Sequence, residues 1–420
     1  MKKLLIIGNG FDLHLKLRSS FSNFFEYERY GKSNSTYYSS ISESNRYENN
    51  GQNPSTIPVR KQIKMYTEYM FNGFDGEQIK PFDQFNFWIL YLGYIKNFPE
   101  FDNINDSFEK NSTTKSLDNW SDVEYQIQLL LSISEEAITN YKKIIYDTQK
   151  YRDGDTYDGY TKTIIETYET SLLNELGKIT YKGVLIINLF HLALVSGWDL
   201  YNEDLYEYLY SELTKLEIEF QKYLLDETKN IDYKNKASKF CSKLVDNSSD
   251  YNLINFNYTS FYKLDDSTKV NIHSTLEENG HPIIGISSTG QDEDIFKKPY
   301  FKFSKTYRIM SLSRSSDVKE ILPDNVDEII FYGQSLSDAD YLYFESIFNH
   351  YKIYEKNSNV KLIFKYSNFE VKNNKITPEQ SQVLSAYRLI NKFAERNGHK
   401  NLLTNQLMFR KVCIDLLEEE

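Results

Sequence analysis

The sequence is poor in cysteine and has no apolar run long enough to cross a membrane. Its two cysteines, Cys241 and Cys413, lie far apart, which argues against a disulfide framework and a CxxC metal knuckle. The longest apolar stretch, residues 183–198, is interrupted by polar residues and is shorter than the ~20 residues that span a bilayer. The apolar run at the N-terminus stops at Gly8, too early for a signal peptide. We therefore expect a soluble, cytoplasmic protein with no membrane partner.

Positive charge is also in deficit. Lys and Arg number 49 against 60 Asp and Glu, so the net charge is -11. Proteins that bind nucleic acid neutralise its phosphates with Lys and Arg, and the sequence has no dense block of either, so nucleic acid is disfavoured as a partner. Asp, Glu and His do not cluster with metal-ligand spacing, so we predict no metal site.

The chain has strand patterns near both ends and a helical middle. Residues 4–7 are typical of a parallel strand buried on both faces, and helical periodicity follows over residues 11–25. Further strands are predicted at 251–256, 269–273, 282–286, 328–332 and 360–364, and helices at 84–94, from 121 onward, 160–177, 184–196, 204–227, 338–351 and 378–394. The pattern favours an α/β fold with a Rossmann-like parallel sheet, residues 1–30 and 245–420. A mainly helical insertion or lid, residues 31–244, would interrupt it, beginning with a loop at 31–60.

A glycine-rich turn, Gly8-Asn9-Gly10, directly follows the first strand. Its backbone N–H groups can approach an anion closely, and a following helix adds a favourable dipole. Leu13 stands where the dinucleotide fingerprint needs a third glycine, and no Gly-Lys-Ser/Thr follows, so a conventional dehydrogenase and a P-loop are disfavoured. The turn predicts phosphate or nucleotide binding, with a merely tight turn as the alternative.

Two later strands end in residues that can do chemistry. Asn257 follows the strand at 251–256 and can both donate and accept hydrogen bonds. His273 ends the strand at 269–273, and histidine is the usual general base near neutral pH. Taken alone, each is at least as readily structural, the Asn as a turn residue and the His as a core residue.

A further glycine turn follows the strand at 328–332. Gly333 and Ser335 lead to Asp338 and Asp340 near a helix start, the layout of a backbone nest for a polar ligand. Either Asp could instead stabilise the helix N-terminus. Because parallel sheets gather ligands at the carboxyl ends of their strands, we expect all these strand ends to meet in one site around Gly8.

Four segments also resemble the AbiH abortive-infection family. They occur in the family's order as IIGNGFDL with a following SSFxxF, then NWSDVE, FNYT and YGQSLSDAD. The resemblance implies defence of bacteria against phage by halting the growth of infected cells. A phage-derived trigger would then be a partner, and a homo-oligomer stays open.

The same landmarks resemble sirtuin-like NAD-consuming domains, which implies NAD as substrate and a sirtuin-like form of the core. Asn257 would then position the water or the ribose, and His273 would be the base. The residues expected to line the dinucleotide are Gly8, Asn9, Gly10, Asp12, Gly333, Ser335 and Asp338.

The sequence departs from that second pattern in several places. Ser274 replaces the glycine after the histidine, Lys16 replaces a glycine of the first helix, and Thr259 replaces an aspartate. The four-cysteine zinc module of the deacetylase sirtuins is absent, which argues against protein deacetylation.

These observations favour a phage-defence NAD glycohydrolase that cleaves the bond between nicotinamide and ribose. That reaction develops positive charge on the ribose, and Asp12 and Glu124 are candidate carboxylates to face it. The alternative is a sensor or assembly module that binds a nucleotide without consuming it. A nuclease is the third hypothesis.

Overall fold

The computed structural model describes the chain in segments. They are residues 2–30, 86–89, 91–92, 120, 122–132, 204–230, 232–263, 266–273, 275–276, 282–286, 295–312, 321–336, 340–355, 357–368, 376–399 and 401–417. The predicted loop at 31–60 and the predicted helices at 160–177 and 184–196 lie outside these residues.

The chain forms two compact units. One comprises Met1–Ser20 with Glu217–Glu420, and the other comprises Phe21–Leu216. The first 20 residues therefore fold with the C-terminal half of the chain, although residues 21–216 separate the two in the sequence. The sequence-based division at 30/31 and 244/245 stays a prediction.

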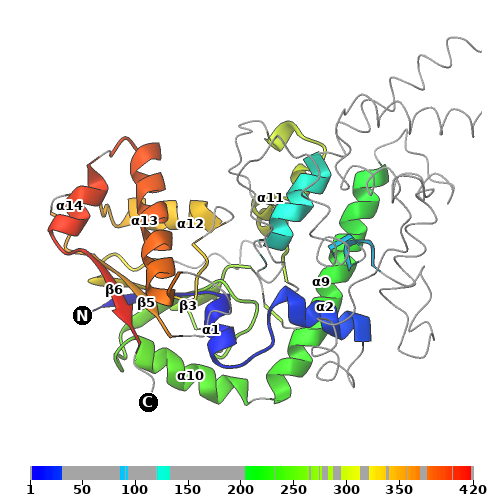
Figure 1. The fold of residues 1–420 in the computed structure, drawn as a ribbon, viewed down its shortest axis with the longest axis horizontal. Coiled ribbons are helices and arrows are strands. Elements are labelled where there is room, and N and C mark those ends of the chain that lie inside the picture. The colour runs from blue at the N-terminus through cyan, green and yellow to red at the C-terminus, as the bar shows by residue number, and fades with distance from the viewer. Residues whose placement is uncertain are drawn as a thin grey trace, which may run out of the picture. The chain divides into compact units, whose positions relative to one another are not determined.

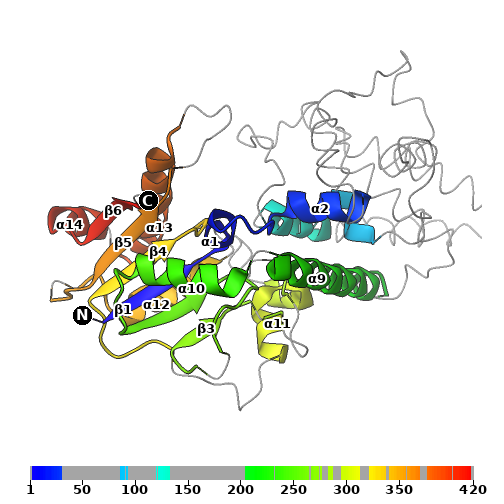
Figure 2. The ribbon, with the colours of Figure 1, turned by 90° about the horizontal axis from the view of Figure 1, so that it is seen from below.

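The first unit is built on a six-stranded sheet. The strands are β1 (Lys3–Ile7), β2 (Tyr251–Asn255), β3 (Lys269–Asn271), β4 (Glu328–Tyr332), β5 (Lys361–Tyr366) and β6 (Val412–Leu416). All neighbours are parallel, in the order β3-β2-β1-β4-β5-β6 (Figures 1 and 2). This is the strand order of a doubly wound Rossmann sheet, so the predicted α/β fold with a parallel sheet is confirmed. The sirtuin-like form of the core stays a prediction.

Helices cover both faces of this sheet. One face carries α1 (Asn9–His14) and α10 (Tyr233–Leu244), and the other carries α12 (Tyr341–His350) and α13 (Pro378–Arg396). Figure 1 shows α10 below the strands and α12 and α13 above them. This unit also contains η4 (Ile295–Lys297), η5 (Phe301–Phe303), α11 (Lys305–Leu312), α14 (Leu402–Met408) and the second part of α9 (Asp204–Asn230).

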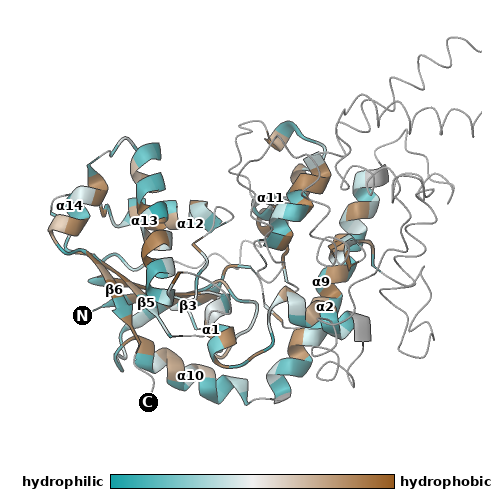
Figure 3. Cartoon of the chain, in the orientation of Figure 1, coloured by the Kyte–Doolittle hydropathy of each residue, from teal (hydrophilic) through white to brown (hydrophobic). Residues whose placement is uncertain are grey.

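Strand β1 lies at the centre of the two cores. Leu4 and Ile6 pack into the core beneath α12 and α13, whereas Leu5 and Ile7 pack into the core beneath α10. All four side chains are fully buried. Successive side chains of a strand point to opposite faces, so a strand covered on both faces reads as an unbroken apolar run, and Figure 3 shows the strands as mainly hydrophobic.

The described parts of the second unit are helical. They are α2 (Phe21–Tyr30), residues 87–89, 91–92 and 122–132, and the first part of α9 (Asp204–Asn230), which runs on into the first unit. Glu212 joins two of them, because its carboxylate accepts a hydrogen bond of 2.9 Å from the backbone N–H of Phe87. Within the described residues the predicted helices at 84–94, 121 onward and 204–227 are confirmed. None of the described helices combines the length and apolarity needed to cross a bilayer.

The predicted strand at 282–286 is wrong. Residues 282–285 form no strand, and Ile286 makes a single parallel bridge to Ser304. In the middle of this segment side chains take the place of a strand partner, because Ile284 donates its N–H to Glu217 and offers its carbonyl to Arg308. The apolar pattern of residues 282–286 correctly indicated that they are buried, but it did not indicate that the backbone of Ile284 would bond to side chains and not to a neighbouring strand.

Candidate functional site

The carboxyl ends of four strands lie level at one edge of the sheet. Ile7 of β1 is paired with Asn255 of β2 and with Tyr332 of β4, and Asn255 is paired with Asn271 of β3. The neighbours β1 and β4 are the switch point of this topology, since the chain leaves β1 for one face of the sheet and β4 for the other. Open α/β sheets bind ligands in the crevice outside such a point.

The glycine turns after β1 and β4 pack directly on each other. The N–H of Gly10 donates a hydrogen bond of 2.8 Å to the carbonyl of Gly333, and the N–H of Gly8 donates one of 3.1 Å to Tyr332. A side chain at Gly10 would place its Cβ 2.6 Å from the Cα of Gly333. The two turns approach so closely that a side chain does not fit between them, which explains why positions 10 and 333 are both glycine.

The other residues of the first turn are held by protein groups. Asn9 accepts a hydrogen bond of 2.6 Å from the hydroxyl of Ser19. The Asp12 carboxylate accepts one of 2.6 Å from the Tyr233 hydroxyl and one of 2.8 Å from the Thr259 hydroxyl. Burial raises the pKa of Asp12 to about 7, while the two hydroxyl donors pull it down. Asp12 is thus a buried carboxyl that titrates near neutral pH.

Asn257 lies at the junction of β1 and β2. Its side-chain amide donates a hydrogen bond of 3.1 Å to the carbonyl of Gly8, and its own backbone N–H donates one of 2.9 Å to Asn255 Oδ1. The backbone carbonyl of Asn257 accepts one of 2.7 Å from Asn271. The structure therefore brings Asn257 against the first glycine turn, as the clustering of strand ends predicts.

His273 lies just beyond β3, at the same edge, and is buried beside two charged side chains. Its Nε2 atom is 3.2 Å from Oδ1 of Asp340, and Nζ of Lys305 is 3.0 Å from the same oxygen. Burial lowers the pKa of His273, and the charge of Lys305 lowers it further, whereas Asp340 opposes both effects. At neutral pH the imidazole is accordingly neutral and able to accept a proton.

The remaining predicted residues divide between the two units. Gly333 is half-buried and Ser335 is exposed, both just after β4, while Asp338 lies outside the described residues. Glu124 belongs to the second unit, where it is buried rather than on a solvated helix face. The assignment of a binding or catalytic role to any of these residues stays a prediction.

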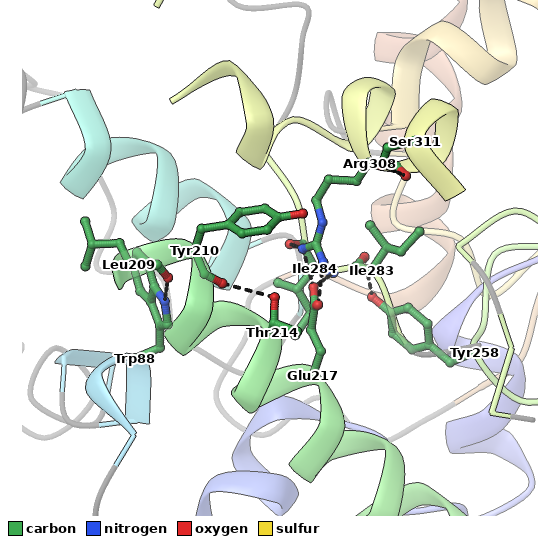
Figure 4. A network of polar contacts seen from close by, with 10 residues as sticks. All are labelled: Trp88, Leu209, Tyr210, Thr214, Glu217, Tyr258, Ile283, Ile284, Arg308 and Ser311. Carbon is green, nitrogen blue, oxygen red and sulfur yellow. Dashed lines mark hydrogen bonds and ion pairs between the residues drawn. The ribbon is translucent and has the colours of Figure 1, made fainter. Parts of the chain in front are cut away.

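A buried ion pair between α9 and α11 was not predicted from the sequence. The two terminal guanidinium nitrogens of Arg308 each donate to the carboxylate of Glu217, Nη2 at 2.5 Å, and both side chains are almost fully buried. Figure 4 shows the pair gathered around Ile284, with the Tyr258 hydroxyl bonded to the carbonyl of Ile283 alongside. Burial raises the pKa of Glu217 to about 6, while Arg308 pulls it down.

Lys305 was also missed, and for Asp340 only ligand binding and helix stabilisation were considered. Both reach His273 from elements distant in the chain, and no motif in the sequence links the three residues. Among the described residues, no group of three or more His, Cys, Asp or Glu side chains could hold a metal ion.

Comparison with protein-family models gives one assignment. Residues 4–366 match the model described as "Bacteriophage abortive infection AbiH". No curated protein and no solved structure matches the chain. The matched range runs from β1 to the end of β5 and so includes the glycine turns, Asn257 and His273. The chain therefore belongs to the AbiH family of bacteriophage abortive-infection defence proteins.

Proposed function

We propose that this phage-defence protein binds NAD at the carboxyl edge of its sheet and hydrolyses the bond between nicotinamide and ribose. The observation that carries the proposal is the alignment of strand ends at the switch point. The turns at Gly8 and Gly333, together with Asn257 and His273, follow four adjacent strands whose ends are level. An edge of this kind is where doubly wound sheets bind nucleotides.

The residues of this edge suit the chemistry of hydrolysis. A water oxygen bonds to C1′ of the ribose as the C1′–N bond breaks, and the electron pair of that bond neutralises the nicotinamide ring. Asn257 would orient the water or a ribose hydroxyl through its amide. His273, neutral because of its lowered pKa, would take the proton that the water loses and pass it to solvent.

The side chains of Asn257 and His273 are buried against other protein groups, so neither is open to substrate in this structure. Asn257 and His273 are 4 % exposed each, the first bound to Gly8 and the second in contact with Asp340. Hydrolysis then requires a rearrangement that opens them to substrate and water. Such a requirement fits a defence enzyme that stays inactive until phage infection provides a trigger.

The same burial favours a second candidate function, a sensor that binds a nucleotide without consuming it. The close contact between the turns at Gly10 and Gly333 could report the presence of a nucleotide by separating or tightening. In that case the edge of the sheet binds the ligand, and no bond is broken.

The test is release of nicotinamide from NAD by the purified full-length protein, with and without lysate of phage-infected cells. Variants Asn257→Ala and His273→Ala are compared with the matched controls Asn252→Ala, at the other end of β2, and His350→Ala, at the end of α12. A positioned general base contributes about 10²–10⁴-fold in rate, so H273A should lose nicotinamide release by a factor in that range.

The outcomes separate the two functions. Release that is lost in N257A and H273A but kept in both controls supports the hydrolase. Calorimetric binding of NAD with no release under either condition contradicts the hydrolase and supports the sensor. Circular dichroism of each variant confirms that a loss of release is not a loss of folding.

A further inference from the structure

Three segments of the first unit meet at a buried cluster of ionisable side chains. His273 lies two residues beyond β3, Lys305 is the first residue of α11, and Asp340 is the residue before α12. Oδ1 of Asp340 lies 3.0 Å from Lys305 Nζ and 3.2 Å from His273 Nε2. One carboxylate oxygen therefore faces both the lysine ammonium and the imidazole.

Asp340 stands at a helix N-cap but does not act as a cap. An aspartate there usually accepts a hydrogen bond from a backbone N–H of the first turn. The side chain of Asp340 makes no such bond, and its carboxylate is directed at Lys305 and His273 instead. Stabilisation of the helix by a capping bond thus does not account for an aspartate at this position.

The position of Lys305 depends on a glycine. A Cβ on Gly285 would lie 2.9 Å from Cγ of Lys305 and 3.0 Å from its backbone nitrogen. The absence of a side chain at Gly285 lets the start of α11 approach closely. The N–H of Lys305 also donates a hydrogen bond of 3.1 Å to the carbonyl of Ile286, which fixes the backbone of the lysine.

His273 is enclosed by aromatic rings, and its Nε2 atom lacks a hydrogen-bond partner in the described part of the chain. The rings of Phe256, Tyr258 and Tyr343 lie 5.5, 6.2 and 6.1 Å from the imidazole, centroid to centroid. Although Nε2 is near Asp340, the alignment falls short of a hydrogen bond, and this buried atom has no such partner in the described part of the chain. A buried polar atom without a partner is costly, and such atoms mark sites that bind or react.

We propose that Asp340 and Lys305 are positioning residues that set the orientation and the proton affinity of His273. The Asp340 carboxylate lies 3.2 Å from Nε2 and favours the protonated imidazole by its charge, and Lys305 holds that carboxylate in place while opposing protonation of the ring. The consequence for catalysis rests on the proposed NAD hydrolysis, whereas the coupling among the three side chains does not.

The two partners act on His273 with opposite signs. A negative charge near an imidazole favours its protonated form, and a positive charge disfavours it. Asp340 raises the pKa of His273 and Lys305 lowers it. The other ionisable groups packed against the ring are the phenols of Tyr258 and Tyr343, and the first of these donates its proton to the Ile283 carbonyl. Removing the two charged partners one at a time should therefore move the pKa in opposite directions.

The first measurement is an NMR titration of the full-length protein labelled with ¹⁵N-histidine. The chain has 6 histidines, and a His273→Gln variant assigns the signal of interest. We expect Asp340→Asn to lower the pKa of His273 and Lys305→Met to raise it, each by about one unit, a common size for charge effects in proteins. Asp246→Asn is the matched control, because Asp246 also lies between two lysines, Lys3 and Lys365, and should leave His273 unchanged.

The result that would overturn the coupling is a His273 pKa that moves in the same direction in D340N and K305M, or moves in neither. If D340N does not fold, K305M alone must raise the pKa above that of the wild type, and failure to do so overturns the proposal. These outcomes are independent of NAD turnover, so a wild-type protein that releases no nicotinamide refutes the proposed hydrolysis and leaves this test intact.

The second measurement is the pH profile of nicotinamide release. In D340N the rise of kcat/KM with pH should move to lower pH, and in K305M to higher pH, in step with the titrations. D340N should reduce kcat at least tenfold with little change in KM, and Asp340→Glu should restore part of the loss. A D340N variant that loses kcat with an unmoved pH profile would show a purely structural role and would contradict the proposal.

Discussion

At the scale of single residues, the first unit is notable for ionisable groups that are fully buried. Asp12, Glu217 and His273 are each almost inaccessible to solvent. Burial disfavours the charged form of any group, so it raises the pKa of both carboxyls and lowers that of the imidazole. Such groups link the stability of the folded chain to pH.

Asp12 gives the clearest prediction of this kind. Its pKa is about 7 in the folded chain against a usual value of 3.8, so between these values the unfolded chain has released a proton that the folded chain retains. The contribution of Asp12 to the free energy of unfolding is therefore fully present below pH 3.8 and is lost as the pH rises to about 7, by up to about 1.4 kcal/mol per pH unit. Asp12→Asn should remove this slope.

Urea unfolding of wild type and D12N at a series of pH values between about 5 and 8 measures the effect. We expect the stability difference between the two proteins to change by on the order of 2 kcal/mol across that range. Asp246→Asn is the control, because the pKa of Asp246 is lowered by Lys3 and Lys365, against the effect of its burial, and the carboxylate stays ionised throughout. Parallel curves for wild type and D12N would contradict the account.

At the scale of elements, the strands that pair around β1 could be predicted from the sequence. Apolar runs ended by glycine or asparagine predicted β1, β2 and β4 almost to the residue. The edge strand β6 was missed, because its residues Val412–Leu416 are half-exposed or exposed and alternate less clearly. Helices α10, α11 and α14 were missed as well, since local pattern alone does not reveal which face a short helix buries.

The contact between the turns after β1 and β4 makes a specific prediction about glycine. Gly333 and Gly398 both have a positive φ, +67° and +73°, which costs a residue with a side chain about 1–2 kcal/mol. A Cβ at Gly398 would meet nothing within 4 Å, whereas a Cβ at Gly333 would lie 2.6 Å from the backbone carbon of Gly10. Gly333→Ala should therefore destabilise the protein by a further ~1–3 kcal/mol relative to Gly398→Ala.

Chemical denaturation of the two variants measures that difference directly. Both variants carry the cost of a side chain at positive φ, whereas only Gly333→Ala adds a steric clash with the backbone of Gly10. Equal losses of stability would mean that the two turns can separate at no cost. The close approach would then not be a fixed feature of the site.

At the scale of the molecule, the clustering of strand ends could be predicted, but the partners of the clustered residues could not. Parallel strand order follows from buried apolar runs, and it brings Asn257 and His273 to the edge that carries Gly8. The contacts of Asp340 with His273 and with Lys305 depend on how α11 and α12 pack. Those helix positions are set by tertiary contacts that no local pattern encodes.

The Glu217–Arg308 pair makes a prediction at this scale, because it joins α9, α11 and the segment around Ile284. Removing one partner leaves a buried charge without compensation and typically costs 3–5 kcal/mol, whereas replacing both with apolar residues of similar size is often neutral. We expect Glu217→Leu and Arg308→Met each to destabilise the protein by about this amount. The double variant should lose less than the sum of the two, because it removes the unpaired charge, but it should not reach wild-type stability, because the N–H and carbonyl of Ile284 lose their side-chain partners. Additive losses in the double-mutant cycle would contradict the pairing.

The central claim is that a nucleotide binds at the carboxyl edge of the sheet, and hydrogen–deuterium exchange with and without saturating NAD tests it most directly. The account predicts slower exchange at residues 8–14, 256–260 and 333–336, which follow β1, β2 and β4. Residues 247–250 and 324–327, which precede β2 and β4 at the opposite edge, should exchange at unchanged rates. Protection confined to the opposite edge, or no protection anywhere in the first unit, would contradict it.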